Sequence, residues 1–297
     1  MRYFIILTFF LFSCGDGAQT LPSSTGTNSE VIFVVADALW ESGVDSLAYA
    51  TFGKIIEGIN QNESAFRVVQ VNQSEFKSIL KTHKNIVIIA EGAHHSSQKN
   101  KWAKGQFVAQ LNWDNNRVQL LKELNKLVSI VSLKEVKYIR NTFAKLSQKN
   151  AEKEIFNHFG IEVIIPKEYE VISNSDSVFW ATFNPPKSEE IKNILTFSFI
   201  PKTTNLQAEV LQNTDNIFAK YLKGEREGSF VKIEPSYPPY YNDNNYRGLW
   251  KLEYGFMGGP FLIKTYFIDD KIVVNVGLIF APQSRKRSYI KELEAIL

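Results

Sequence analysis

The residues best suited to hold a ligand are aromatic and cluster in the last quarter of the chain. Residues 236–245 are rich in Tyr, Pro and Asn, and aromatic and basic side chains continue just beyond them. Tyrosine and tryptophan rings stack on sugar rings and anchor protein interfaces at a small entropic cost. The candidate ligand surface therefore comprises Tyr240, Tyr241, Tyr246, Arg247 and Trp250. Turn formation and core packing are the alternative interpretation of the same residues.

Cys14 is the only cysteine, and the residues before it are typical of an export signal. Arg2 opens the chain, and an apolar run over residues 3–12 follows. As a helix this run covers about 15 Å, half of a hydrocarbon core of about 30 Å, so it is too short to span a bilayer. Leu11-Phe12-Ser13-Cys14 resembles the bacterial lipobox, although Phe12 is bulkier than usual. The sequence predicts a signal peptide over residues 1–13 and lipid attachment at Cys14.

A lipid on Cys14 would fix the compartment and use the only thiol of the chain. No disulfide framework, thiolate metal site or cysteine nucleophile then remains. Residues 14–30 are mostly Gly, Ser, Thr, Asn and Asp, a composition that predicts a flexible tether between the lipid and the folded part. Gly15 lacks the acidic character that favours inner-membrane retention in some bacteria. We expect a membrane partner through the lipid, and the outer membrane of the cell envelope as the location.

Charge and hydropathy exclude some classes of function. The chain is 44% hydrophobic with a net charge of only +3, and its basic and acidic residues are interleaved. This pattern does not indicate nucleic-acid binding. The basic cluster Arg285-Lys286-Arg287 is interpreted as a solvated helix start in preference to a contact with anionic lipid. No second apolar run approaches the 18 residues of a spanning helix.

Hydrophobic periodicity predicts alternating strands and helices in the first half. Continuous apolar runs indicate buried strands at 31–36 and 86–90, the second of them central in its sheet. The remaining expected elements are a strand at 66–71, an edge strand at 106–112, helices at 46–59 and 72–81, and a long helix at 116–159 with a possible break at 129–132. Asn72 and Glu75 form the capping-box pattern that opens the helix at 72–81.

The second half is rich in predicted strands. They lie at 161–165, 170–173, 178–183, 191–200, 230–234, 249–254, 261–268 and 271–280, with helices at 206–222 and 284–297 and a loop at 236–245. The fold class is therefore α+β, with an N-terminal βαβα part over 31–159 and a C-terminal antiparallel sheet flanked by helices over 160–297. The order of the later elements is similar to the Mog1/PsbP type of sandwich, an analogy that implies no function.

Motifs along the mature chain resemble an uncharacterised lipoprotein family of Bacteroidota, domain of unknown function 4837. The motifs that carry the resemblance are Leu21-Pro22-Ser23-Ser24, Val34-Val35-Ala36-Asp37, Leu39-Trp40, Phe179-Trp180, Arg247-Gly248-Leu249-Trp250, Met257-Gly258-Gly259-Pro260-Phe261, Ala281-Pro282, Lys286-Arg287 and Leu293-Glu294-Ala295-Ile296-Leu297. The C-terminal motifs are the specific ones. The resemblance implies a lineage and a compartment, and it implies no catalytic residue because that family has no assigned activity.

Histidine and acidic residues do not form a recognisable catalytic or metal motif. Adjacent residues such as His94 and His95 point to opposite sides of a strand, and zinc sites use wider spacings such as His-x₃-His with further ligands. His83 and His158 are expected at the surface or at a helix end. We therefore predict no metal, no cofactor and no catalytic set.

The function that fits these observations is a lipid-anchored, non-enzymatic binding or assembly module. Its aromatic segment would hold an envelope protein or cell-wall glycan. The alternative is a cell-envelope hydrolase acting on glycan or peptide, with Asp37, Glu91 or the pair His94-His95 in a cleft. Acids that follow buried strands lie at the sheet edge where ligands bind in α/β folds, which is the motivation for this alternative.

Overall fold

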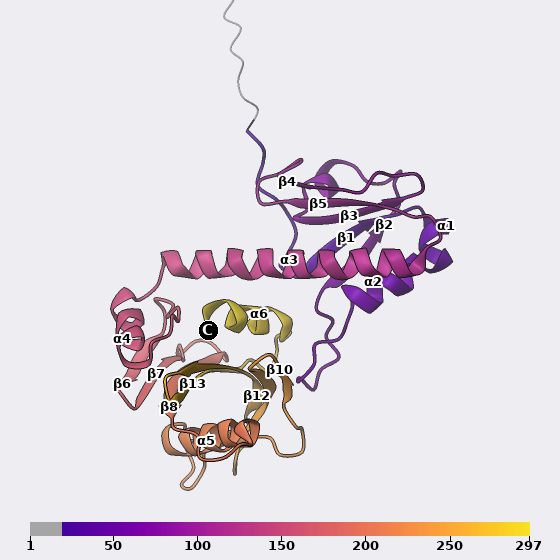
Figure 1. Ribbon diagram of the computed structural model, residues 1–297. Helices are drawn as coiled ribbons and strands as arrows, with labels where there is room; N and C mark the ends of the chain where they lie inside the picture. The colour runs from indigo at the N-terminus through magenta and orange to yellow at the C-terminus, as the bar shows by residue number, and fades with distance from the viewer. Residues whose placement is uncertain (1–19) are drawn as a thin grey trace, which may run out of the picture.

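Two sheets of different type form the body of the protein, and a long helix lies between them (Figure 1). The computed structural model describes residues 20–297. The N-terminal sheet is mostly parallel and the C-terminal sheet is antiparallel, which confirms the predicted α+β class. The predicted signal peptide and Cys14 lie outside the described residues. None of the helices within 20–297 is long and apolar enough to cross a membrane.

The N-terminal sheet has five strands in the order β2-β1-β3-β5-β4. Its strands are β1 (Glu30–Val34), β2 (Arg67–Val71), β3 (Asn85–Ala90), β4 (Ser96–Lys99) and β5 (Phe107–Asn112), all parallel except β4. Val31 and Phe33 pack on one face toward the helices, whereas Ile32 and Val34 pack on the other. Burial on both faces explains why β1 and β3 are continuous apolar runs.

The predicted strands at 31–36, 66–71 and 86–90 are confirmed, and β3 is central. The strand predicted at 106–112 is confirmed as β5, but its predicted position at the sheet edge is wrong, because β4 pairs outside it. All four residues of β4 are exposed, so this strand has no apolar alternation that would reveal it.

Helices in this half are shorter than the sequence suggested. They are α1 (Asp37–Leu39), η1 (Trp40–Val44), α2 (Asp45–Thr51) and the 3₁₀ helix η2 (Ser78–Thr82). The predicted helix at 72–81 does not form, because the Asn72 side chain accepts the Ser74 amide at 3.2 Å and closes a turn. The helix predicted over 46–59 ends at Thr51, and residues 53–66 run as a loop toward the C-terminal half.

Helix α3 (Arg117–Lys145) is continuous through the predicted break at 129–132. The Ser129 hydroxyl donates to the Asn125 carbonyl within the helix at 3.1 Å, so serine does not interrupt it. The chain turns after α3 instead, where Gln148 donates its side-chain amide to the Pro166 carbonyl at 3.1 Å. Helix α4 (Lys149–Phe159) follows.

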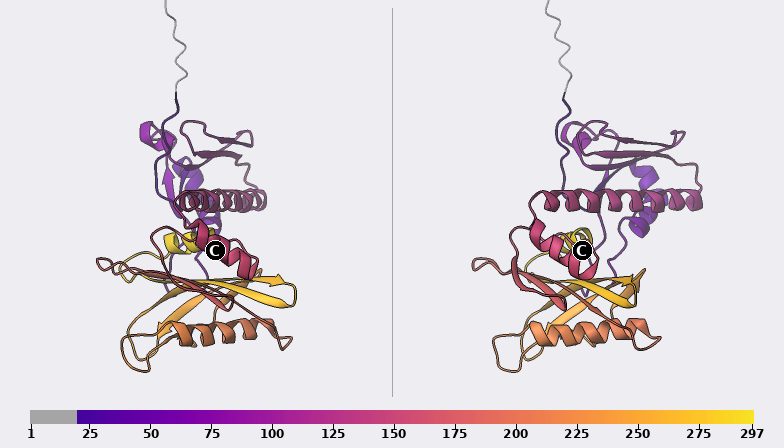
Figure 2. Two further views of the ribbon diagram at one scale, coloured as in Figure 1. Left: turned by 90° about the vertical axis from the view of Figure 1, so that its left-hand side faces the viewer. Right: turned by 60° about the vertical axis from the view of Figure 1, so that its left-hand side comes forward.

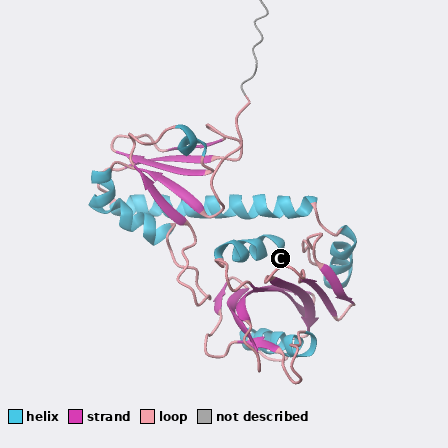
Figure 3. Cartoon of the chain, turned by 180° about the vertical axis from the view of Figure 1, so that it is seen from behind, coloured by secondary structure: helices cyan, strands magenta, loops and turns pink. Residues whose placement is uncertain are grey.

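The C-terminal sheet follows the order β10-β11-β12-β13-β8-β7-β6, with β9 paired to β11. Its strands are β6 (Glu170–Asn174), β7 (Val178–Phe183), β8 (Ile191–Phe199), β9 (Val231–Ile233), β10 (Tyr240–Asn242), β11 (Asn245–Leu252), β12 (Gly258–Ile268) and β13 (Lys271–Phe280). Helix α5 (Leu206–Tyr221) covers one face, and α4 and α6 (Arg287–Ile296) cover the other (Figure 2). Figure 3 shows the sheet curving around α5.

Two predictions for this half are wrong. Residues 161 and 163–165 are buried, but the segment 161–165 pairs with no strand, and the Ile164 amide donates to the Ile296 carbonyl at 2.8 Å. The predicted loop at 236–245 contains β10 and a tight hairpin into β11. Asp243 and Asn244 form its turn with positive φ values of 45° and 62°, which these two residue types tolerate best after glycine.

The first described residues belong to the folded body. The Ser24 amide donates to the Lys104 carbonyl at 2.9 Å, and the Lys84 amide donates to the Thr25 carbonyl at 3.0 Å. Ser29 is buried at the start of β1. Residues 22–29, which the prediction placed in a tether over 14–30, are therefore bound to the sheet. Helix α4, predicted in the N-terminal subdomain, packs its buried Ala151, Ile155 and Phe159 into the C-terminal core.

Candidate functional site

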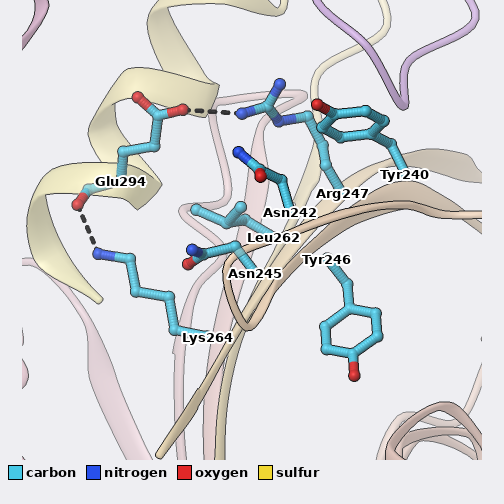
Figure 4. A pocket seen from close by; sticks show the side chains of 8 residues that line it. All are labelled: Tyr240, Asn242, Asn245, Tyr246, Arg247, Leu262, Lys264 and Glu294. Atoms are coloured by element: carbon cyan, nitrogen blue, oxygen red, sulfur yellow. Dashed lines mark hydrogen bonds and ion pairs between the residues drawn. The ribbon is translucent and has the colours of Figure 1, made fainter. Parts of the chain in front are cut away.

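A polar pocket of about 290 Å³ opens where β10–β12 face helix α6 (Figure 4). The residues that line it are Tyr240, Asn242, Asn245, Tyr246, Arg247, Leu262, Lys264 and Glu294. Two basic groups, one acidic group, two amides and one exposed tyrosine thus converge on one cavity. We call this cavity the α6 pocket.

Strand register explains how residues from three strands reach the α6 pocket. Tyr240 pairs with Arg247, and Arg247 pairs with Leu262, so these three side chains form one row across the sheet. Asn245 pairs with Lys264 in the next row. Directly opposed residues point to the same face of a sheet, which places both rows beneath α6.

Glu294 on α6 holds both basic groups of the pocket. The Arg247 guanidinium donates to the Glu294 carboxylate at 2.9 Å and also to the Glu57 carbonyl at 3.2 Å. The Lys264 ammonium donates to the backbone carbonyl of Glu294 at 2.8 Å. Burial lowers the pKa of Lys264, the Glu294 carboxylate opposes this shift, and the positive charge of Arg140 adds to it. The side chains of Arg247 and Lys264 are therefore held in place by α6 and the loop at 53–66. The amide and tyrosine side chains of the pocket lie beside them.

A second cavity of about 300 Å³ adjoins the α6 pocket. Both cavities are lined by Tyr240, Asn242, Arg247 and Glu294. The second cavity also touches the loop at 53–66 and helix α3, so it lies between the N-terminal and C-terminal halves. The two cavities together give the site an elongated outline.

Two family models match the chain along its length. One, described as domain of unknown function DUF4837, matches residues 148–297, which is half of the chain. The chain belongs to the DUF4837 family. The predicted resemblance to domain of unknown function 4837 is thereby confirmed for residues 148–297, whereas the motifs predicted at 21–40 lie outside this match. A second model, domain of unknown function DUF8532, matches residues 24–155, and no curated protein matches the chain.

The DUF4837 region contributes every residue of the α6 pocket. The adjoining cavity is lined from both matched regions, because residues such as Thr51 and Val128 fall within the DUF8532 match. The elongated site is therefore formed only when the two regions pack together.

The sheet separates the five residues predicted as one ligand surface. Tyr240 and Arg247 face the α6 pocket, but Tyr246 and Trp250 are only 4% and 6% exposed and pack in the core on the α5 side. Figure 4 shows the Tyr246 ring pointing away from the other labelled side chains. Tyr241 also lies on that side, with its ring 4.9 Å from the ring of Tyr246. Alternate residues of a strand face opposite sides, which is why neighbours in sequence are divided.

The glycines beside the aromatic segment serve backbone packing. A side chain at Gly259 would collide with the carbonyl oxygen of Ile279, and the indole of Trp250 donates to that same oxygen at 3.1 Å. The backbone at Gly259 therefore lies close to the neighbouring strand β13.

Histidines and acids singled out in the first half lie apart from the α6 pocket. Asp37 and Glu91 follow β1 and β3, and Asp37 accepts the side-chain amide of Gln70 at 2.9 Å. His94 and His95 are exposed before β4. Across residues 20–297, no group of three or more His, Cys, Asp or Glu is placed to hold a metal ion.

The predictions for His83 and for the basic cluster have different outcomes. His83 lies at a helix end, one of its two predicted positions, because it caps η2, and it is buried there with its ring 2.8 Å from the Glu30 carboxylate. The basic cluster at the start of α6 is not a solvated surface, since Lys286 is buried and Glu63 accepts the amides of Lys286 and Arg287 at 2.7 and 3.0 Å. A carboxylate at a helix N-terminus satisfies amides that have no partner inside the helix.

The sequence reasoning also missed a buried ion pair between Glu135 of α3 and Lys291 of α6. Glu135 is 3% exposed and accepts hydrogen bonds from the Ser29 amide and from the Asn85 side chain at 2.8 Å. The Lys291 ammonium also lies 4.0 Å above the ring of Phe66. The sequence contained one signal for this buried pair. Glu135 lies four residues after Val131 and four before Ile139, so an acidic residue interrupts an apolar helix face.

Proposed function

We propose that this protein is a lipid-anchored module of the bacterial cell envelope that binds a segment of cell-wall glycan in the α6 pocket. The observation that carries the proposal is the convergence of Tyr240, Asn242, Asn245 and Arg247 on one cavity. Sugar hydroxyls both donate and accept, and side-chain amides offer both functions. A tyrosine ring adds an apolar face on which a sugar ring stacks.

The shape of the site supports a chain-like ligand. The adjoining cavity shares four lining residues with the α6 pocket and extends the site toward the N-terminal half. An extended polymer segment would occupy both cavities, whereas a single small molecule would fill one. Arg247 and Glu294 are already fixed by their mutual ion pair, so they would meet the ligand without a large loss of side-chain entropy.

Removing the ring of Tyr240 should weaken glycan binding roughly tenfold, the loss of about 1.4 kcal/mol expected for one stacked ring. Tyr241→Ala is the matched control, because both tyrosines are 40% exposed but only Tyr240 lines the pocket. The measurement is co-sedimentation of the unacylated mature chain, residues 14–297 with Cys14→Ser, with purified peptidoglycan sacculi.

Equal retention of Tyr240→Ala and wild type on sacculi would refute glycan binding at this pocket. A crosslinked protein partner recovered by wild type and lost in Tyr240→Ala would reassign the pocket to an envelope protein. Release of soluble sugar from the sacculi would support the hydrolase alternative.

Lipid attachment is tested separately at Cys14. Wild-type protein should incorporate a clickable palmitate analogue in growing cells, and Cys14→Ser should incorporate none and keep its signal peptide, because the thiol is the acyl acceptor. The measurements are in-gel fluorescence and intact mass. An unlabelled wild-type band, or uncleaved wild-type protein, would refute the anchor. The proposed lineage, Bacteroidota, rests on the resemblance to the DUF4837 family, and the proposed outer-membrane location rests on the lipobox and on Gly15 after Cys14.

A further inference from the structure

A third cavity, separate from the two described above, lies where the chain enters the N-terminal sheet, between residues 23–28 and helix α3. Its volume is about 490 Å³, and four of its lining residues are lysines: Lys84, Lys104, Lys134 and Lys137. In Figure 1 the first described segment passes the end of this sheet close to α3 before it enters β1. We call this cavity the lysine pocket, and it shares no lining residue with the α6 pocket.

Two of the lysines are fixed in place by neutral groups. The Lys134 ammonium donates to the Lys84 carbonyl at 3.0 Å and to the Asn85 side-chain oxygen at 3.2 Å. The Lys84 ammonium donates to the Asn28 side chain at 2.9 Å and lies 5.7 Å from the centre of the Tyr138 ring. Lysine has three N–H donors, so each of these ammonium groups keeps at least one for a ligand.

Within the described part of the chain, the one carboxylate that lines the lysine pocket is already paired with groups other than the four lysines. Its acidic lining residue, Glu135, is bound by Lys291 and by the Ser29 amide. Among the ion pairs of residues 20–297, none involves the four pocket lysines. The pocket therefore concentrates positive charge without a protein counterion.

The pKa of Lys134 is lowered mainly by burial, and neighbouring positive charges add a smaller effect. Burial lowers the pKa of Lys134 to about 8, Glu135 opposes the shift, and the positive charges of Lys84 and Lys99 add to it. An anion bound between these groups would cancel their repulsion and favour the charged form of Lys134. The site is thus one that a multivalent anion would stabilise.

We propose that the lysine pocket binds a phosphate-bearing anion, and that a phospholipid headgroup at the membrane surface supplies it. Lysine ammonium groups are common phosphate ligands. Ser23, which lines the pocket, is nine residues after Cys14, and a chain of that length reaches at most about 30 Å. The membrane as source rests on the proposed lipid anchor, whereas phosphate binding does not.

The test uses the unacylated mature chain, residues 14–297 with Cys14→Ser, so that no acyl chain contributes to binding. Wild-type pocket protein should float with vesicles of phosphatidylcholine containing phosphatidic acid and remain unbound with phosphatidylcholine alone. The triple variant Lys104→Gln/Lys134→Gln/Lys137→Gln should lose at least about tenfold in affinity, because each lysine near an anionic surface contributes roughly fivefold.

The matched control is Lys187→Gln/Lys220→Gln/Lys271→Gln, which removes the same charge from three positions of the C-terminal half outside the pocket. Equal losses in the two triple variants would overturn the proposal, since diffuse charge would then explain binding. The proposal would also be overturned if the pocket variant bound the vesicles with the affinity of the wild type and unfolded at the same temperature. Circular dichroism melting of both variants distinguishes a binding loss from unfolding.

Inorganic phosphate and glycerol 3-phosphate distinguish the two sources of the anion. Competition by either compound against vesicle binding supports one phosphate site that meets the membrane. Calorimetric binding of phosphate to the wild type and not to the pocket variant, without flotation of either, would keep the phosphate site and overturn the headgroup as its source. Because the acyl group is absent from every arm, failure of palmitate labelling at Cys14 would leave these results unaffected.

Discussion

Lys291→Ala should lower the free energy of unfolding by about 3–5 kcal/mol, among the largest effects of any single change to a charged residue in this protein. Removal of the ammonium would leave the Glu135 carboxylate charged, 3% exposed and without its counterion. The variant would also lose the cation above Phe66. Urea or guanidinium unfolding followed by tryptophan fluorescence measures the loss.

The matched comparison is Glu135→Gln/Lys291→Met, which removes both charges and keeps most of the volume. Replacing a buried ion pair by uncharged groups of similar size is often close to neutral, so the double variant should be more stable than Lys291→Ala. The side-chain amide introduced at position 135 would still accept a hydrogen bond from the Ser29 backbone amide. A loss below about 1 kcal/mol for Lys291→Ala would show that Glu135 finds water or another partner, and that the pair does not hold the two halves together.

Trp250→Ala should destabilise the protein by about 3–5 kcal/mol, as expected for a tryptophan replaced within a packed core. Trp250 is 6% exposed, packs beside Phe280 at a ring separation of 6.4 Å and donates its indole N–H to the Ile279 carbonyl. Trp250→Phe keeps part of the packing and removes the hydrogen bond, so its loss should be smaller. Chemical unfolding of the purified variants gives both values.

Tyr240→Ala provides the contrast for Trp250→Ala. Tyr240 is 40% exposed in the α6 pocket, and its truncation should change stability by no more than about 0.5 kcal/mol while weakening glycan binding. A Trp250→Ala protein with normal stability and impaired ligand binding would contradict the assignment of Trp250 to the core. The two variants therefore separate the packing and the ligand interpretations of the aromatic segment.

Contacts between the two halves converge on α6 and the loop at 53–66. Ile56 and Ile59 of this loop pack on Ile290, and Glu63 caps the start of α6. The Tyr237 hydroxyl donates to the Ile59 carbonyl at 2.7 Å. The loop thus forms one wall of the elongated site and also fixes the relative position of the two sheets.

Helices and strands that depend on the pattern of neighbouring residues could be predicted from the sequence, and most of these predictions were confirmed. β3 and β13 appear as strands because most side chains along a strand buried on both faces are apolar. α5 and α6 appear as helices through the periodicity of their apolar residues. β4 could not be recognised from the sequence because it is an exposed edge strand. Such a strand forms through backbone pairing, which leaves no pattern in its side chains.

The sequence by itself determined the α+β class, most strands, and the presence of Tyr240 and Arg247 beside a polar turn. Only the tertiary structure decided which of the five candidate residues share a face, because a hairpin at Asp243 and Asn244 fixes the strand register. It also decided which residues contact Glu135, His83 and the lysines of the lysine pocket. These groups meet residues more than 45 positions away, and such contacts depend on the packing of whole elements rather than on local pattern.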